Sequence, residues 1–166
     1  MSHGEALMEL TRQVRGDTLQ VLDAAQADWL TWSPKGTSNH ILWHAGHAVW
    51  LQDLLCVELL TERSELSEGW AAMFGASSQP GTIKEWPSRD DVRSRLKTQL
   101  ASVLKLLEGT PDDLLLGTPT NFRDTRTNRG WIIHGLHDEA KHNGEMYLLC
   151  KLCRHREQDL PQRTTE

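Results

Sequence analysis

Apolar residues recur at helical spacing in four long segments of the chain. Three or four positions separate successive apolar residues there, which places them on one face of a helix. The segments for which we predict helices are residues 5–27, 38–60, 88–109 and 131–155. The second is apolar nearly all round, a pattern typical of a buried helix. The pattern therefore predicts an all-α fold.

Capping residues suggest where two of these helices begin. A Ser-Pro-Lys-Gly turn precedes the second helix, so Thr37 or Ser38 is expected to cap it. Ser88 is the predicted cap of the third helix, with two aspartates in the first turn, where the helix dipole favours acidic groups.

A long connection separates the second and third predicted helices. Residues 61–87 contain several Gly and Pro and predict an irregular crossover, and connections of this length are often functional. Trp70 and Trp86 lie in it and are expected to pin it to the helices. We predict a four-helix bundle with a long crossover between the second and third helices, forming a single domain over residues 1–166.

Composition narrows the classes of partner. The formal net charge is −5 and no basic tract occurs, which argues against nucleic acid or an anionic membrane surface as partner. The sequence contains neither a run of 18 apolar residues nor a signal peptide, so we expect a cytoplasmic protein. Three cysteines are an odd number for a disulfide framework, and Cys150 and Cys153 are expected to be free thiols.

Six of the eight histidines fall in two short clusters, one in the second predicted helix and one in the last, and these are His40, His44, His47, His134, His137 and His142. The first three lie on one stripe of the second helix. In the last helix His134, Asp138, His142 and Glu145 share a stripe about 80° wide, at about 100° per residue, with His137 just outside it. A single buried histidine is more often satisfied by hydrogen bonds. Several on one stripe favour a metal, because burying polar rings costs free energy unless each finds a partner.

Two stretches of the chain resemble the DinB-like superfamily of bacterial helical-bundle metalloproteins. They are residues 40–53, which read HILWHAGHAVWLQD, and residues 137–145, which read HDEAKHNGE. The resemblance extends over essentially the whole chain. It implies a divalent metal held by one histidine of the second helix and two histidines four residues apart in the last. Carried over, the first and last ligands are His47 and His142.

The sequence departs from the family at the middle ligand. The residue four before His142 is Asp138 rather than His. A carboxylate can also bind zinc, nickel or manganese, so His47, Asp138 and His142 form the predicted ligand set. Three further histidines, one from the second helix and two from the last, are possible additional or substitute ligands: His44, His134 and His137. Zinc or nickel is the expected ion, with manganese or iron as alternatives.

The resemblance also implies the kind of chemistry. Activities in the superfamily include transfer and isomerisation reactions that depend on low-molecular-weight thiols such as bacillithiol or mycothiol. Our first hypothesis is a metal-dependent transferase that uses such a thiol and a small-molecule substrate, with metal-dependent hydrolysis as the alternative reaction. The second is a non-catalytic, dimeric metal-binding module. We expect a homodimer and no nucleic-acid or membrane partner.

Overall fold

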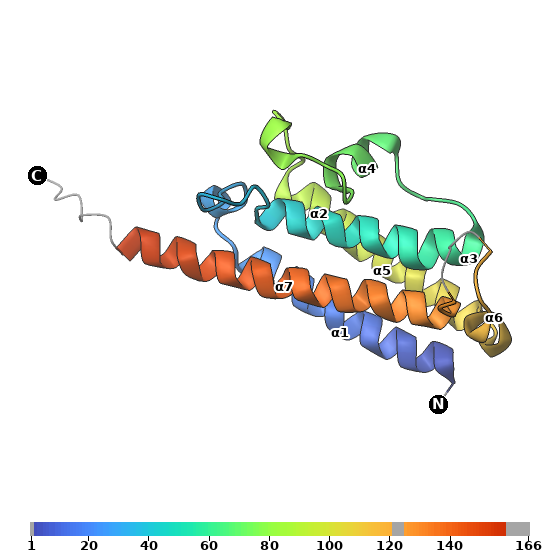
Figure 1. Ribbon diagram of the computed structural model, residues 1–166. Coiled ribbons are helices and arrows are strands. Elements are labelled where there is room, and N and C mark those ends of the chain that lie inside the picture. The colour runs from blue at the N-terminus through green and yellow to red at the C-terminus, as the bar shows by residue number, and fades with distance from the viewer. Residues whose placement is uncertain (1, 121–124, 159–166) are drawn as a thin grey trace, which may run out of the picture.

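The fold is built from helices. The computed structural model describes residues 2–120 and 125–158, and all regular secondary structure in these residues is helical, which confirms the all-α prediction. Four long helices run lengthwise beside one another (Figure 1). They are α1 (His3–Ala24), α2 (Ile41–Gln52), α5 (Arg89–Gly109) and α7 (Asn128–Gln158).

The long helices enclose the apolar core. α1 packs against α5 and α7, and α2 packs against the same two helices. Every residue from His40 to Val49 is buried, as expected for a helix that is apolar nearly all round. One part of the core surrounds α2 and the indole of Trp29, and another lies around Leu107 and Ile132. Within the described part of the chain, no helix is long and apolar enough to cross a membrane.

α1 ends three residues before the predicted position. A capping box between Ser2 and Glu5 begins the helix. Ala25 is extended, which stops the helix at Ala24, and the short helix η1 (Ala27–Trp29) follows.

The start of α2 differs from the prediction. His40, and not Thr37 or Ser38, is the N-cap, because its Nδ1 accepts a hydrogen bond from the backbone N–H of Trp43 at 3.1 Å. His40 is therefore a helix cap with its ring against Trp86. At the other end α2 continues through a π-helical segment, η2 (Asp53–Glu58), into α3 (Leu59–Thr61).

The crossover contains more helix than predicted. It includes α4 (Glu68–Phe74), which Ser67 caps, and η3 (Pro80–Thr82). Hydrogen bonds fasten it to α2: the Trp70 indole N–H donates to the carbonyl of Gly46 at 3.2 Å. The ring of Trp86 packs against His40 at the start of α2, so both tryptophans hold the crossover against this helix, as predicted. Both rings also contact Phe74 within the crossover.

The last two long helices begin close to where the sequence placed them. Ser88 caps α5 through a capping box with Asp91, as predicted. A short helix, α6 (Asp112–Leu116), follows α5. α7 begins at Asn128, three residues before the predicted start, and its amide side chain donates to the carbonyl of Leu114 at 2.9 Å.

Candidate metal centre

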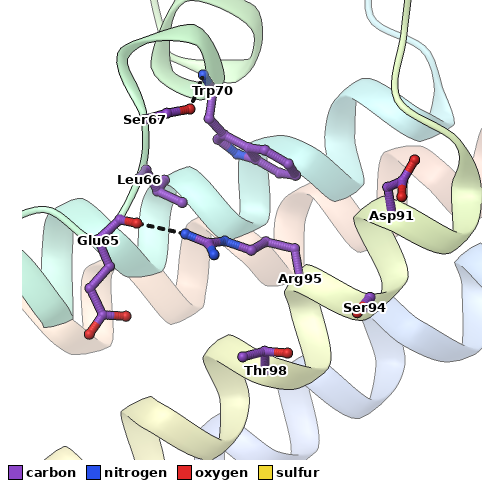
Figure 2. A pocket seen from close by; sticks show the side chains of 8 residues that line it. All are labelled: Glu65, Leu66, Ser67, Trp70, Asp91, Ser94, Arg95 and Thr98. Carbon is purple, nitrogen blue, oxygen red and sulfur yellow. Dashed lines mark hydrogen bonds between the residues drawn. The ribbon is translucent and has the colours of Figure 1, made fainter.

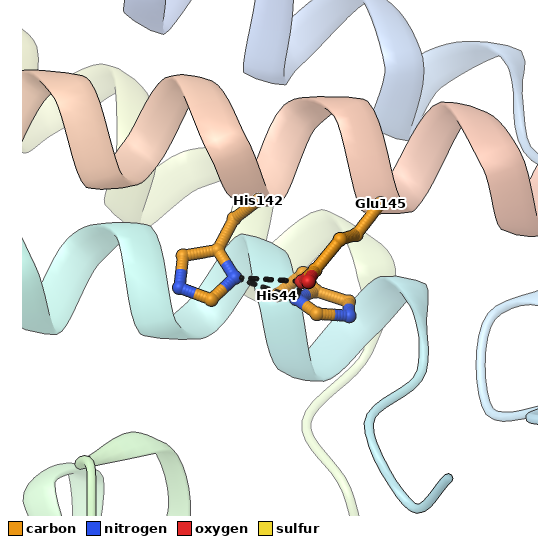
Figure 3. A group of neighbouring side chains, drawn as sticks. All are labelled: His44, His142 and Glu145. Carbon is orange, nitrogen blue, oxygen red and sulfur yellow. Dashed lines mark hydrogen bonds and ion pairs between the residues drawn. The ribbon is translucent and has the colours of Figure 1, made fainter.

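Three side chains from α2 and α7 converge on one point. Nδ1 of His44 lies 2.9 Å from Nδ1 of His142 and 3.2 Å from Oε2 of Glu145. The same Glu145 oxygen lies 3.1 Å from Nδ1 of His142. Figure 3 shows the three groups facing one another between the two helices. His44 is buried, whereas the side chain of Glu145 is 57% exposed, so the cluster is reachable from solvent.

The donor set of His44, His142 and Glu145 fits a cation better than it fits protons. If both Nδ1 atoms carry a proton, the two N–H groups point at the same oxygen and at each other. If only one does, the lone pair of the unprotonated Nδ1 faces the Glu145 carboxylate, which is also an acceptor. A divalent ion satisfies all three lone pairs together. Ligands of tetrahedral zinc at about 2.1 Å lie about 3.4 Å apart, so a small side-chain rotation would admit the ion.

His47 is oriented as metal-binding histidines commonly are. Its Nδ1 lies 2.6 Å from the carbonyl oxygen of Phe74, which can only accept, so Nδ1–H donates and Nε2 keeps its lone pair. Its ring stacks on Trp43 and approaches that of His142 edge to face, with centroids 4.6 Å apart. The crossover thus sets the direction of a predicted ligand.

Asp138 has other neighbours. Its carboxylate accepts a hydrogen bond from Lys141 at 2.9 Å and lies 3.5 Å from Nε2 of His134. Burial alone would raise its pKa, but the bond from Lys141 and the charge of His134 lower it. His134, His137 and Asp138 form a second group whose ligand atoms lie within 4.8 Å of one another.

The structure therefore places the predicted ligands in one region but pairs them differently. His142 contacts the ring of His47, and it joins His44 and Glu145 in the convergent cluster. The set of His47, Asp138 and His142 stays a prediction. The sequence analysis places Glu145 on the same helix stripe as His142 but does not predict it as a ligand. Residues three apart on a helix are neighbours, so its spacing from His142 could have indicated that the two side chains meet.

Burial keeps two of these histidines in the metal-binding form. It lowers the pKa of His44 to about 3, with the neighbouring histidines contributing, and that of His47 to about 4. Both rings are therefore neutral at physiological pH, as ligation requires.

The depressed pKa values predict an acid-sensitive fold. Burial also lowers the pKa of His40 to about 4. As pH falls below 6.5, the unfolded chain takes up protons that these folded histidines do not. The free energy of unfolding should therefore fall between pH 7 and pH 4, by up to about 1.4 kcal/mol per pH unit per histidine. Urea unfolding of metal-free protein at pH 7 and pH 5 measures this. His44→Gln should lose less stability than the parent; equal stability of the parent at both pH values would contradict the prediction.

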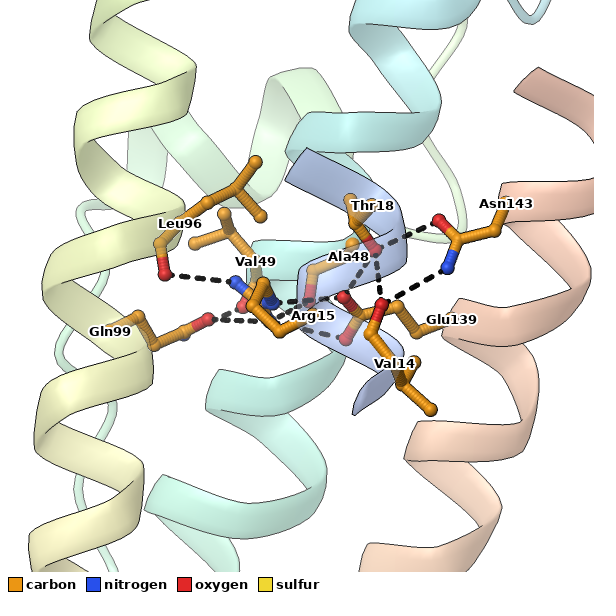
Figure 4. Close-up of polar contacts among 9 residues, drawn as sticks. All are labelled: Val14, Arg15, Thr18, Ala48, Val49, Leu96, Gln99, Glu139 and Asn143. Carbon is orange, nitrogen blue, oxygen red and sulfur yellow. Dashed lines mark hydrogen bonds and ion pairs between the residues drawn. The ribbon is translucent and has the colours of Figure 1, made fainter. Parts of the chain in front are cut away.

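A buried ion pair fixes α7 against α1 beside the cluster. Nε of Arg15 lies 2.8 Å from Oε1 of Glu139, and both side chains are almost fully buried. The guanidinium also donates to the carbonyl of Ala48 and to the amide oxygen of Gln99, so it joins all four long helices (Figure 4). Because Glu139 lies three residues before His142, this network sets the rotation of α7.

Gly46 permits the crossover to approach His47. A Cβ at Gly46 would lie 2.2 Å from the Phe74 ring, which is fully buried. Gly46→Ala should displace Phe74 together with the carbonyl that orients His47, and cost about 1–3 kcal/mol of stability. If His47 is a ligand, metal affinity should also fall by about 10–100-fold, measured by metal titration.

Gly16→Ala is the matched control for Gly46→Ala. Gly16 lies inside α1, where an added Cβ would have no neighbour within 4 Å, so alanine there should stabilise the helix by about 0.5–1 kcal/mol and leave metal affinity unchanged. Equal behaviour of the two variants would contradict the role given to Gly46.

The cysteines do not belong to the candidate centre. Cys56, Cys150 and Cys153 are all buried and form no disulfide bond, as predicted for the last two. Burial raises the pKa of Cys56 to about 12 and also raises that of Cys150, which makes both poor nucleophiles.

A cavity elsewhere in the molecule has no histidine in its lining. It has a volume of about 510 Å³ and lies between the crossover and α5 (Figure 2). Arg95 donates to the carbonyl of Glu65 across it at 2.7 Å. The residues that line it are Glu65, Leu66, Ser67, Trp70, Asp91, Ser94, Arg95 and Thr98. With mixed charges and no nitrogen ligand, it is a weaker candidate for metal chemistry than the cluster around His142.

The fold and the donor cluster define an all-α bundle protein with a candidate metal centre. The family model of the DinB superfamily matches residues 10–146, and the chain belongs to this superfamily. The chain is similar to the crystal structure of a conserved protein from Enterococcus faecalis, with a TM-score of 0.63 and 16% sequence identity. That match covers 92% of this chain and 97% of the other, and shows a shared fold. No curated protein matches the chain.

Proposed function

We propose that this protein is a divalent-metal-dependent enzyme that transfers a low-molecular-weight thiol to a small-molecule substrate. The convergence of His44, His142 and Glu145 supports it most directly, because three donor atoms meet within 2.9–3.2 Å at a point reachable from solvent. Membership of the DinB superfamily supports it independently. Zinc or nickel suits two imidazoles and a carboxylate best, with manganese or iron as alternatives.

The charges of the donors suit activation of a thiol. Two neutral rings and one carboxylate would leave a divalent ion with a net charge of about +1, so the site would still attract an anion. A bound ion would supply an open coordination position and lower the pKa of a thiol or water there. The protein's own part is to hold the donors: the buried pair of Arg15 and Glu139 fixes α7, which carries His142 and Glu145. Phe74 orients His47, the histidine of the other predicted ligand set.

In the proposed transfer the thiolate sulfur forms a bond to an electrophilic carbon of the substrate. The bond from that carbon to its leaving group breaks. A halide departs with the proton lost by the thiol, whereas an epoxide oxygen takes up that proton and stays on the product. Hydrolysis would place water where the thiol enters. A non-catalytic, dimeric metal-binding module would bind the ion without catalysing either thiol transfer or hydrolysis.

The test compares the zinc- or nickel-loaded protein with His142→Ala. A panel of low-molecular-weight thiols is incubated with epoxide and aryl-halide acceptors, and the loss of free thiol is followed. Metal-dependent thiol consumption that disappears in His142→Ala would support transfer. Product formation with water alone would support hydrolysis instead. Stoichiometric metal without either reaction would favour the non-catalytic module.

A further inference from the structure

A small cavity opens directly beside the donor cluster. It has a volume of about 280 Å³ and lies between α7 and the loop that precedes α2. His44 and Glu145 form one side of it. The full lining consists of Pro34, Thr37, Asn39, His44, Glu145, Leu148, Leu149 and Leu152. A molecule seated there would touch two of the three convergent donors.

The walls of this cavity are mainly hydrocarbon. Leu148 and Leu152 are 54% and 37% exposed, although they adjoin a polar cluster. Among the described residues that line the cavity, none is Lys or Arg, and Glu145 carries the single formal charge. An anionic ligand would find no cation in these walls, whereas an apolar ligand would cover the exposed leucines.

We propose that this cavity holds the apolar part of the substrate, a neutral small molecule that presents one polar group to His44, His142 and Glu145. The inference rests on the proposed function and narrows its substrate class. At roughly 30 Å³ for a group the size of a water molecule, the cavity holds about nine such groups. Thr37 and Asn39, in the loop that forms the opposite side, offer polar contacts for a single hydroxyl or amide of the ligand.

Straight-chain alkanethiols, from ethanethiol to octanethiol, test this in the cobalt-loaded protein, whose absorption changes when a thiolate binds. Affinity should rise about fourfold for each added methylene until the cavity is full. Leu148→Asn should flatten this rise without unfolding the protein, because the side chain is already half exposed. Ile133→Asn is the matched control: it is 38% exposed on the same helix but outside the cavity, and it should keep the full rise.

A metal-free measurement keeps the two proposals separate. 1-Hexanol is titrated into metal-free protein while the methyl resonances of Leu148, Leu149 and Leu152 are followed by NMR. Saturable shifts confined to these leucines are expected, and Leu148→Asn should weaken them. Failure to bind metal would overturn the proposed function while this titration still tests the cavity. Metal binding with no dependence on chain length, or no hexanol shifts at the three leucines, would overturn the substrate class alone.

Discussion

Replacing His142 by alanine is expected to abolish stoichiometric binding of a divalent metal. His142 belongs both to the convergent cluster with His44 and Glu145 and to the ligand set predicted with His47 and Asp138. Changes to residues that merely orient a ligand typically cost 10–100-fold in affinity, so losing a ligand should cost more than about 100-fold. Titration with zinc or nickel, followed by measurement of bound metal after gel filtration, gives the result.

The choice between the two ligand sets follows from four further variants. If His44 and Glu145 bind the ion, His44→Ala should match His142→Ala, and Asp138→Asn should have little effect. If His47 and Asp138 bind it, His47→Ala and Asp138→Asn should weaken binding, and Asp138→His should retain metal with a preference for zinc or nickel. His155→Ala, on the exposed surface of α7, is the control. Retention of stoichiometric metal by His142→Ala would exclude both sets.

The apolar pattern was sufficient for the fold but not for its local departures. The spacing of residues such as Leu7, Val14 and Leu22 depends only on which face of a helix meets the core, and these three are buried as that predicts. The start of α2 depends on one contact with an earlier segment and on an unusual cap. Leu42 donates its N–H to the carbonyl of Leu30, and the cap is the ring of His40. Neither contact can be predicted from helix propensities or from the spacing of apolar residues.

The site was predictable to the level of the helix face but not of the side chain. Periodicity placed His142 and Glu145 on one stripe, and the structure joins them. Periodicity also placed Asp138 there, but its carboxylate contacts Lys141. Which donors meet depends on rotamers and on the carbonyl of Phe74, which lies 27 residues beyond His47. A sequence pattern contains no information at that scale.

Arg15→Met is expected to destabilise the protein by about 3–5 kcal/mol, the usual cost of breaking a buried ion pair. Arg15 and Glu139 lie 124 residues apart in sequence and pair in the core, where both side chains are almost fully buried. Removing the cation leaves the Glu139 carboxylate buried, with the Thr18 hydroxyl at 2.7 Å as a remaining partner. Urea unfolding monitored by tryptophan fluorescence measures the loss.

The double variant Arg15→Met/Glu139→Leu separates charge from packing. Because it removes both charges and fills the space with hydrocarbon, it should recover most of the stability that Arg15→Met loses. It should nevertheless bind metal more weakly than the parent. The Arg15 guanidinium, which links Glu139 of α7 to Ala48 of α2 and Gln99 of α5, is absent from the double variant. Full recovery of both stability and metal affinity would mean that packing alone positions His142. Failure to recover stability would mean that the loss in Arg15→Met does not arise from the uncompensated carboxylate.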